Sequence, residues 1–265
     1  MGVAGVVGGG RPAELGHVAG SESRLLARVE GLTDAEAAAP SRLPGWSRAE
    51  VLTHVARNAD SFRAMAEAAM RDDVADQYPG GIEQRSADIA AGRGRSAAAV
   101  VADLSQAVEW LHETWAAMPD EAWSRPGRSW GSLMPMAETV RARWIEIEVH
   151  HVDLALGASA EDWSLPFCQA ALTRLTARLP LRAQEPPDAR WVLWADDLAL
   201  AWSVSALAGQ VTVSRFEEDD PPPDVIVRGP GAQLTAWLLD RESRDLAVSG
   251  DGRLYRQFHQ AFPGP

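Results

Sequence analysis

Two glutamates and two histidines stand among apolar residues in the segment RARWIEIEVHHVDLALG, residues 141–157. Burying such groups is costly unless they are paired with another charge or bound to a metal ion. Glu146 and His150 are four residues apart, so a helix projects both from the same face. A carboxylate and an imidazole at this spacing are suited to holding one divalent cation. The segment is therefore the first candidate for a site with chemistry.

A helical projection of residues 136–156 sorts the polar groups of this segment. One narrow polar stripe lies between two apolar sides, and it consists of Arg143, Glu146, His150 and Asp153. The stripe is thus predicted to be the middle of the buried face. Arg141 and Glu148 fall on the remaining arc, where we expect solvent, and His151 lies near the edge of the apolar side as a packing neighbour.

Two interpretations of the buried stripe remain open from this helix alone. In the first, Glu146 and His150 bind a metal ion, and Asp153 orients the imidazole of His150. In the second, the stripe is an intrahelical ion-pair network that joins Arg143 to Glu146 and His150 to Asp153. The projection favours neither.

A third candidate ligand, His54, lies in another predicted helix, residues 47–70. Ser47 and Glu50 form a capping box that marks where this helix begins. His54 borders its apolar face and points inward, and a lone histidine in such a place is more often an ordinary core residue. Together with Glu146 and His150, however, it completes a His, Glu, His set that leaves a fourth position for water or substrate. Catalytic zinc sites have this arrangement.

The remaining reactive residue types give weaker signals. His17, His112 and His259 have no partner at ligand spacing, and His112 is expected on an ordinary helix surface. Cys168 begins an apolar helical pattern and is interpreted as a buried structural residue. The sequence contains no phosphate-binding glycine loop and no G-x-S-x-G motif, which argues against nucleotide and serine-hydrolase chemistry.

Four long helical patterns must position these residues. They cover approximately residues 12–32, 47–70, 96–118 and 136–156, and Gly157 is expected to stop the last one. A polar, glycine-bearing link, residues 71–85, separates the second helix from the third. Four helices with one long link between the second and third predict a bundle with a crossover.

The chain changes character after residue 157. One helix is expected at 166–179, followed by strands at 190–195, 200–206, 210–216 and 224–229. Two further helices, 232–239 and 252–261, flank a short strand at 246–250. We therefore predict an α+β protein with a helical domain, residues 12–157, and a small α+β domain with a mostly antiparallel sheet, residues 158–265.

The composition of the chain limits the kinds of partner that the protein can bind. The formal net charge of −12 and the pI near 4.9 argue against nucleic acid and anionic membranes, which bind clustered cations. No apolar stretch reaches the ~20 residues that span a bilayer. The start of the chain, MGVAGVVGGGRPAELG, is interpreted as a ragged leader and not as a signal peptide. A single cysteine fits a reducing compartment, so we expect a cytoplasmic protein. We also expect a monomer or weak homodimer that acts on a small molecule.

Four segments carry a resemblance to a known family. They are LPGWSRAEVLTHVARNADSFRAM (43–65), QYPGGIEQR (77–85), RWIEIEVHHVDLALG (143–157) and AWLLDR (236–241). Together they resemble the mycothiol-dependent maleylpyruvate isomerases, which join a DinB-type metal-binding four-helix bundle to a small C-terminal α+β domain. The resemblance covers most of the chain. The first ten residues and the acidic turn FEEDDPPPD (216–224) have no assigned counterpart.

The resemblance implies a set of functional residues and cofactors. His54, Glu146 and His150 would be the ligands of Zn²⁺ or another divalent metal, with mycothiol as the thiol cosubstrate. An arginine of the C-terminal domain would contribute to activity, and Arg241 is the best match, with Arg228 as the alternative. All 25 basic residues are arginine, a pattern of GC-rich genomes that fits an actinobacterium, where mycothiol replaces glutathione.

The activity implied by this resemblance is the cis to trans isomerisation of maleylpyruvate, or a similar unsaturated dicarboxylate, by reversible thiol addition. Two alternatives stay open. The same scaffold serves mycothiol S-transferases, which keep the thiol adduct of an electrophilic metabolite. A non-catalytic module that binds metal and acts as a sensor or interaction partner belongs to a different class.

Overall fold

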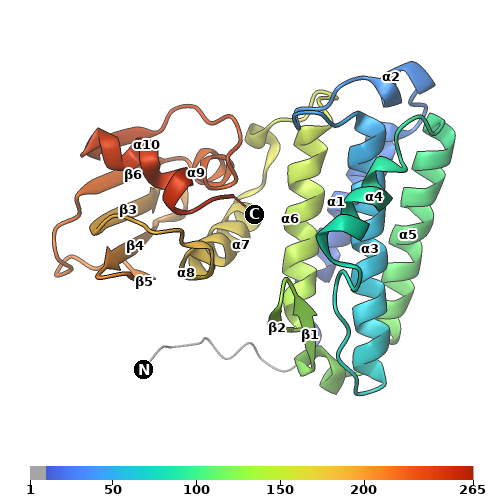
Figure 1. Cartoon of the computed structure of the whole chain (residues 1–265), viewed down its shortest axis with the longest axis horizontal. Helices are drawn as coiled ribbons and strands as arrows, with labels where there is room; N and C mark the ends of the chain where they lie inside the picture. The colour runs from blue at the N-terminus through green and yellow to red at the C-terminus, as the bar shows by residue number, and fades with distance from the viewer. Residues whose placement is uncertain (1–9, 265) are drawn as a thin grey trace. The chain divides into compact units, whose positions relative to one another are not determined.

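The computed structural model describes residues 10–264 as two compact units, the first ending at Ala158 and the second beginning at Ser159. The first unit is helical, and the second combines helices with a sheet (Figure 1). The predicted α+β class is therefore confirmed. Residues 1–9 of the predicted leader lie outside the described part of the chain.

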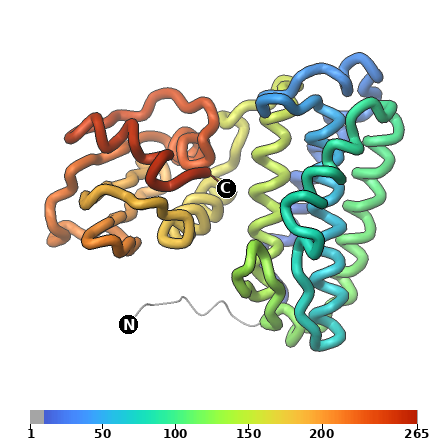
Figure 2. The backbone as a smooth tube through the Cα atoms, in the orientation of Figure 1, coloured from blue at the N-terminus to red at the C-terminus, as the bar shows by residue number. Residues whose placement is uncertain are grey.

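Four long helices form the first unit. They are α1 (Leu15–Val29), α3 (Arg48–Met70), α5 (Ala97–Ala117) and α6 (Ala137–Asp153). The helices run side by side (Figure 2), and α6 packs against both α1 and α3, while α3 packs against α5. All four correspond to predicted helices, and each is shorter than predicted because the terminal turns are not helical.

The capping box fixes where α3 begins. The backbone N–H and hydroxyl of Ser47 donate to the Glu50 carboxylate over 2.9 and 2.8 Å, and the Glu50 N–H donates to the Ser47 hydroxyl over 3.3 Å. These bonds satisfy backbone and side-chain groups at the first turn, where no preceding helical turn exists. With the start fixed, the seventh residue of α3, His54, faces the bundle interior and is 3% exposed.

The crossover between α3 and α5 has more structure than the predicted polar link. It contains α4 (Gly81–Ala90), a mostly exposed helix that packs on α3 and buries only Ile89 of its own residues. The other short elements were also not predicted: α2 (Asp34–Ala38), a 3-10 turn (Asp120–Ser124) and the hairpin of β1 (Pro126–Ser129) and β2 (Ser132–Pro135). Elements this short show too few repeats for a periodic pattern to emerge.

The end of α6 differs from the prediction. The helix stops at Asp153, with Leu154 as its C-cap, and not at Gly157. Ala155 already has a positive φ of 54°, so the backbone leaves the helical region before it reaches the glycine. The guanidinium of Arg48 donates to the carbonyls of Leu154 and Ala155 over 2.7 and 3.1 Å, which stabilises this early termination.

The second unit is built on a five-stranded sheet in the order β5-β4-β3-β6-β7. Its strands are β3 (Ala189–Ala195), β4 (Leu200–Leu207), β5 (Gln210–Arg215), β6 (Val225–Gly229) and β7 (Ala247–Gly250). Only β3 and β6 pair in parallel, with Trp191 opposite Val225. The remaining pairs are antiparallel, so the predicted sheet is confirmed.

Four helices accompany this sheet: α7 (Leu165–Ala177), α8 (Leu179–Arg182), α9 (Gly231–Leu238) and α10 (Gly252–Ala261), besides short 3-10 turns at Ala160–Asp162 and Asp196–Leu198. The indole of Trp191 lies 6.1 Å from the Phe258 ring and 5.7 Å from the Phe262 ring, which joins β3 to α10 in an aromatic core. Cys168 is completely buried in α7, as predicted. Within residues 10–264, no helix is both long enough and apolar enough to cross a bilayer.

Candidate metal centre

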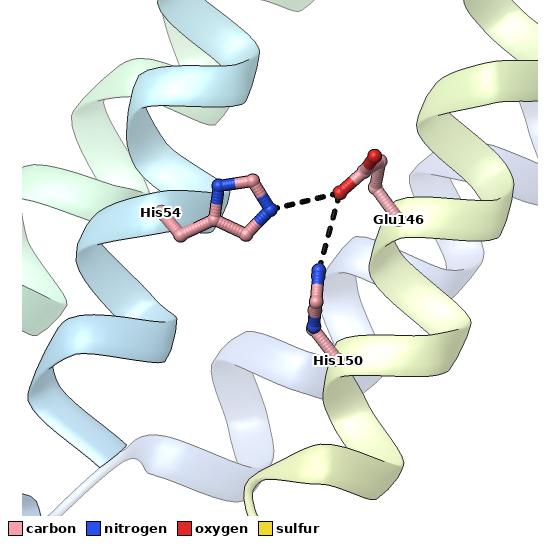
Figure 3. A group of neighbouring side chains, drawn as sticks. All are labelled: His54, Glu146 and His150. Carbon is pink, nitrogen blue, oxygen red and sulfur yellow. Dashed lines mark hydrogen bonds and ion pairs between the residues drawn. The ribbon is translucent and has the colours of Figure 1, made fainter. Parts of the chain in front are cut away.

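Three potential ligands from two helices meet inside the first unit. His54 comes from α3, and Glu146 and His150 come from α6 (Figure 3). The Nε2 atoms of His54 and His150 lie 3.0 and 3.2 Å from the same oxygen, Oε2 of Glu146. One donor atom from each residue lies within 4.8 Å of the other two. The sequence-predicted set is thus brought together with its donor atoms converging on one point.

Asp153 sets the orientation of His150. Its completely buried carboxylate lies 2.9 Å from Nδ1 of His150. Because this ring nitrogen donates to the carboxylate, Nε2 is the nitrogen presented to Glu146. Histidine ligands of metals are commonly held in this way by a carboxylate on the far nitrogen. The structure therefore places Asp153 where the sequence predicted an orienting group.

His54 is held from its other side by an arginine. The guanidinium Nη2 of Arg85, on α4, lies 3.3 Å from Nδ1 of His54. Arginine has only donors, so Nδ1 accepts this bond and Nε2 carries the proton that is donated to Glu146. Arg85 was not predicted as a site residue although it ends one of the resembling segments. Its position depends on how α4 folds back on α3, and the sequence does not reveal that contact.

The electrostatics of the three groups differ. Burial lowers the pKa of His54 to about 4, and the hydrogen bond with Glu146 only partly offsets this effect. Burial also opposes the charged form of His150, but the bonds to Asp153 and Glu146 outweigh it and raise the pKa to about 9. For Glu146, the two imidazoles overcome the effect of burial and hold the pKa well below its ordinary value. Glu146 is therefore an ionised carboxylate that faces two imidazoles.

The group is accessible from one side. The Glu146 side chain is 32% exposed, whereas that of His54 is only 4% exposed. A cavity of about 230 Å³ borders His54, between α3, the loop 76–81 and α4. Of the three donors only His54 lines this cavity, and the exposed part of Glu146 is what opens the group to solvent. A catalytic metal site must be open in this way, and a closed structural site is not.

The prediction that Arg141 and Glu148 of α6 face solvent is wrong. Glu148 is only 6% exposed and accepts hydrogen bonds from the Ser21 hydroxyl and the Arg24 guanidinium, both over 2.5 Å. Arg141 is half-buried and donates to Glu14 over 2.8 Å. The reason is that α1 packs on this arc, so α6 is covered by two neighbouring helices. His151, expected as a packing neighbour, is 9% exposed.

The intrahelical ion-pair interpretation is half wrong. Arg143 does not pair with Glu146: its guanidinium donates to Glu22 of α1 over 2.8 Å, and to Asn58 Oδ1 and the Val55 carbonyl over 2.9 and 2.7 Å. Only the second predicted pair, His150 with Asp153, is present. Glu146 is consequently left facing two histidines and no arginine, which strengthens the metal interpretation.

The other histidines have structural contacts. His112 was expected on an ordinary helix surface, but it crosses from α5 to form a hydrogen bond with the buried Glu22. The His17 ring stacks on the Trp144 indole with centroids 4.7 Å apart, and the His259 ring lies 4.9 Å from that of Trp237. None of the three belongs to the convergent group among residues 10–264.

Both candidate arginines of the C-terminal domain lie in the second unit. Arg241 follows α9, and its Nη1 donates to the Leu239 carbonyl over 2.8 Å. Arg228 lies on β6, pairs with Asp196 over 2.5 Å and covers the Trp194 ring at 4.8 Å. Arg228 is thus engaged in a local cluster on its own sheet.

Comparison with known proteins supports the architecture and the family. Residues 18–155 match the family model described as the mycothiol maleylpyruvate isomerase N-terminal domain. The crystal structure of a mycothiol-dependent maleylpyruvate isomerase superimposes with a TM-score of 0.74 at 22% identity, covering 89% of this chain and 91% of that chain. The structure of a histidine-to-alanine mutant of such an isomerase superimposes with a TM-score of 0.73 at the same identity and coverage.

The structural likeness at 22% identity shows a shared fold. Comparison with curated protein sequences gives no match. The family model, by contrast, spans more than half of the chain and contains all three convergent residues. This protein therefore belongs to the family defined by the mycothiol maleylpyruvate isomerase N-terminal domain.

Proposed function

We propose that this protein is a metal- and mycothiol-dependent isomerase that converts maleylpyruvate, or a similar cis-unsaturated dicarboxylate, to its trans isomer. The observation that carries the proposal is the convergence of His54, Glu146 and His150 within 4.8 Å in a domain of this family. The structural relative, a mycothiol-dependent maleylpyruvate isomerase, suggests the reaction and the thiol. The local chemistry of the group supplies the reason to expect a metal.

The donor set fits a zinc ion. Two imidazole nitrogens and one carboxylate oxygen are the ligands of many catalytic zinc sites, with a fourth position left for water or substrate. Asp153 supports His150 from behind, and the exposed fraction of Glu146 leaves an approach from solvent. When bound, Zn²⁺ or another divalent ion would place a positive charge that lowers the pKa of a thiol beside it.

The isomerisation requires no net gain or loss of atoms. The sulfur of the cosubstrate thiolate adds to the activated double bond, and the displaced π electrons move onto the neighbouring carbonyl. The former double bond is then single and rotates. The electrons return, the new carbon–sulfur bond breaks, and the thiolate leaves with the trans double bond restored. The protein's task is to hold thiol and dicarboxylate in position for this addition.

Arg241 is proposed to bind one carboxylate of the substrate. A guanidinium matches a carboxylate by two parallel hydrogen bonds, which fixes orientation as well as charge. We expect Arg241→Gln to raise KM more than Arg228→Gln, because Arg241 lies in AWLLDR, a segment that resembles the family. Equal effects of the two variants would contradict the choice of Arg241.

Activity is tested by incubating purified protein with maleylpyruvate, with and without mycothiol. The expected result is a trans product of unchanged mass, formed only with the thiol, and full recovery of free thiol. A stable thiol adduct would instead identify an S-transferase. Absence of any thiol-dependent turnover would contradict both enzymatic interpretations.

The metal ligands are tested separately by zinc analysis of His54→Ala and Glu146→Ala. Both variants should lose zinc while far-UV circular dichroism stays native. The matched control is Glu67→Ala, a carboxylate on α3 that pairs with Arg63 over 2.9 Å outside the donor group. Full zinc retention in both ligand variants would overturn the assignment.

A further inference from the structure

We infer that Arg85 binds a carboxylate of the substrate in the cavity beside His54. The inference deepens the proposed function, and it rests on that function for the identity of the substrate. It assigns a role to a residue that neither the sequence pattern nor the family match identifies. The cavity, of about 230 Å³, lies wholly within the first unit.

Arg85 differs from the other arginine of the cavity wall. Arg57 pairs with Asp60 over 3.0 Å and with Asp103 over 2.6 Å. Within residues 10–264, Arg85 has no carboxylate within ion-pair distance, and its buried Nε makes no hydrogen bond. Its polar contact is the imidazole of His54. A partly buried guanidinium without a counter-charge is costly, so this position favours the arrival of an anion.

The acidic residues of the wall do not supply that counter-charge. Asp60 is paired with Arg57, Asp76 lies 3.2 Å from Arg128, and the Asp88 carboxylate accepts from Gln84 over 2.7 Å. All three are therefore engaged with other side chains. The anion that Arg85 can bind must come from outside the chain.

The position of Arg85 relates this anion to the candidate metal centre. One imidazole ring, that of His54, contacts Arg85 through Nδ1 and Glu146 through Nε2. A carboxylate bound by Arg85 would thus lie one imidazole ring away from the convergent donors. A metal bound through Nε2 requires the proton on Nδ1, which can then no longer accept from Arg85. Metal loading would therefore release the guanidinium toward the cavity.

The chemistry of the wall favours a carboxylate. The Arg85 guanidinium lies 5.5 Å from the centre of the Tyr78 ring, an arrangement that supports its planar fork from one face. A planar fork matches the two oxygens of a carboxylate.

The test measures binding of maleate, a stable cis-dicarboxylate, to zinc-loaded protein by calorimetry in the absence of mycothiol. Arg85→Gln should weaken maleate binding about 10- to 100-fold, as expected for loss of a hydrogen bond between charged groups. Arg85→Lys should recover part of the affinity. The matched control is Arg63→Gln, which removes an arginine of α3 that pairs with Glu67 outside the cavity wall and should leave affinity unchanged.

A second measurement observes Arg85 directly in the wild-type protein. The side-chain ¹⁵Nε signal of Arg85 in the zinc-loaded wild-type protein should shift on addition of maleate, with Arg85→Lys used to assign it. An unchanged signal, maleate affinity of Arg85→Gln within twofold of wild type, or no maleate binding by the wild type would each overturn the inference. Equal affinity for inorganic phosphate would overturn the carboxylate assignment.

Failure of this inference is distinguishable from failure of the proposed function. Calorimetry without thiol reports the carboxylate site alone, whereas thiol-dependent product formation reports the isomerase. Turnover with an unshifted Arg85 signal would reject Arg85 and keep the isomerase. Arg85-dependent maleate binding without turnover would keep Arg85 as a carboxylate-binding residue and reject the isomerase.

Discussion

Two charged clusters on α6 lie one helical turn apart and have opposite character. The first centres on Arg143, which is completely buried and donates to Glu22, Asn58 and the Val55 carbonyl. The second centres on Glu146, whose side chain is 32% exposed and which faces His54 and His150. In the first cluster a carboxylate meets a permanent cation. In the second cluster, the carboxylate and two imidazoles converge without an arginine.

The difference teaches how to separate a structural charge cluster from a binding site. Glu22 and Arg143 neutralise each other's charge inside the bundle, where both side chains are at most 1% exposed. Glu146 has no arginine partner, two neighbouring nitrogens that can become ligands, and an open side. A cluster whose own charges are complete stabilises the fold, whereas a convergent set of donors awaits an external cation. Four predictions test this contrast.

The largest effect is expected from Arg143→Met. Removing the guanidinium leaves the buried Glu22 carboxylate without its main counter-charge, and such a loss costs about 3–5 kcal/mol. Urea denaturation should report this decrease in the free energy of unfolding. Arg63→Met, which breaks a partly exposed pair with Glu67, should cost below about 1 kcal/mol. Equal losses in the two variants would contradict the closed character of the first cluster.

The second prediction concerns the support of His150 by Asp153. Asp153→Asn keeps the shape but removes the carboxylate that holds Nδ1, so zinc affinity should fall about 10- to 100-fold. Competition with a chelator of known affinity measures this change. The outcome that would exclude an orienting role is zinc affinity equal to that of the wild type in a variant with native circular dichroism.

The third prediction concerns pH. Burial alone would raise the pKa of Glu22, but the charge of Arg143 and the bond with His112 outweigh it, so the pKa lies below its ordinary value of 4.5. The resulting stabilisation is complete above pH 4.5 and is lost as the pH falls through the lower folded-state pKa. Glu22→Gln removes this contribution, so its unfolding free energy should fall less steeply below pH 4.5.

The difference in slope is at most about 1.4 kcal/mol per pH unit, because one proton is involved. Urea denaturation at a series of pH values between 3 and 6 measures it. Parallel curves for the wild type and Glu22→Gln would show that the carboxylate is not held ionised by its neighbours. Zinc content should be the same in both proteins, since Glu22 belongs to the closed cluster.

The smallest effect is expected from Glu148→Gln. The amide keeps one acceptor for Ser21 but loses the charge that Arg24 contacts, so the free energy of unfolding should decrease by about 1 kcal/mol. Zinc content should remain unchanged because Glu148 faces α1. Thermal denaturation and metal analysis on one sample separate the two effects. Zinc loss in a folded Glu148→Gln variant would contradict this expectation, because it would connect Glu148 to the metal-binding group.

Sequence periodicity was sufficient for several features of the site. The stripe of Arg143, Glu146, His150 and Asp153 faces the bundle because side chains three and four apart share a helix face. The capping box at Ser47 fixed the phase of α3 and thereby the inward position of His54. These features depend on spacing within one helix, so a sequence contains them.

Partner choice between helices could not be predicted in the same way. Arg143 could reach Glu146 on its own helix, yet it pairs with Glu22, 121 residues away. Glu148 was placed in solvent because nothing in the segment 136–156 reveals that α1 covers its arc. Arg85 reaches His54 only because α4, which is too short and too exposed for a clear pattern, folds back on α3.

The sequence by itself determined the polar stripe of α6, the inward position of His54, the class of the second unit and the chemical nature of the candidate ligands. Periodicity, capping and turn signals depend on residues close together in the chain and can therefore be predicted from the sequence. Only the tertiary structure decided which charges neutralise one another and which remain available to a ligand. That division depends on the packing of α1, α3, α4 and α6, which brings together residues far apart in sequence and excludes water from some of them.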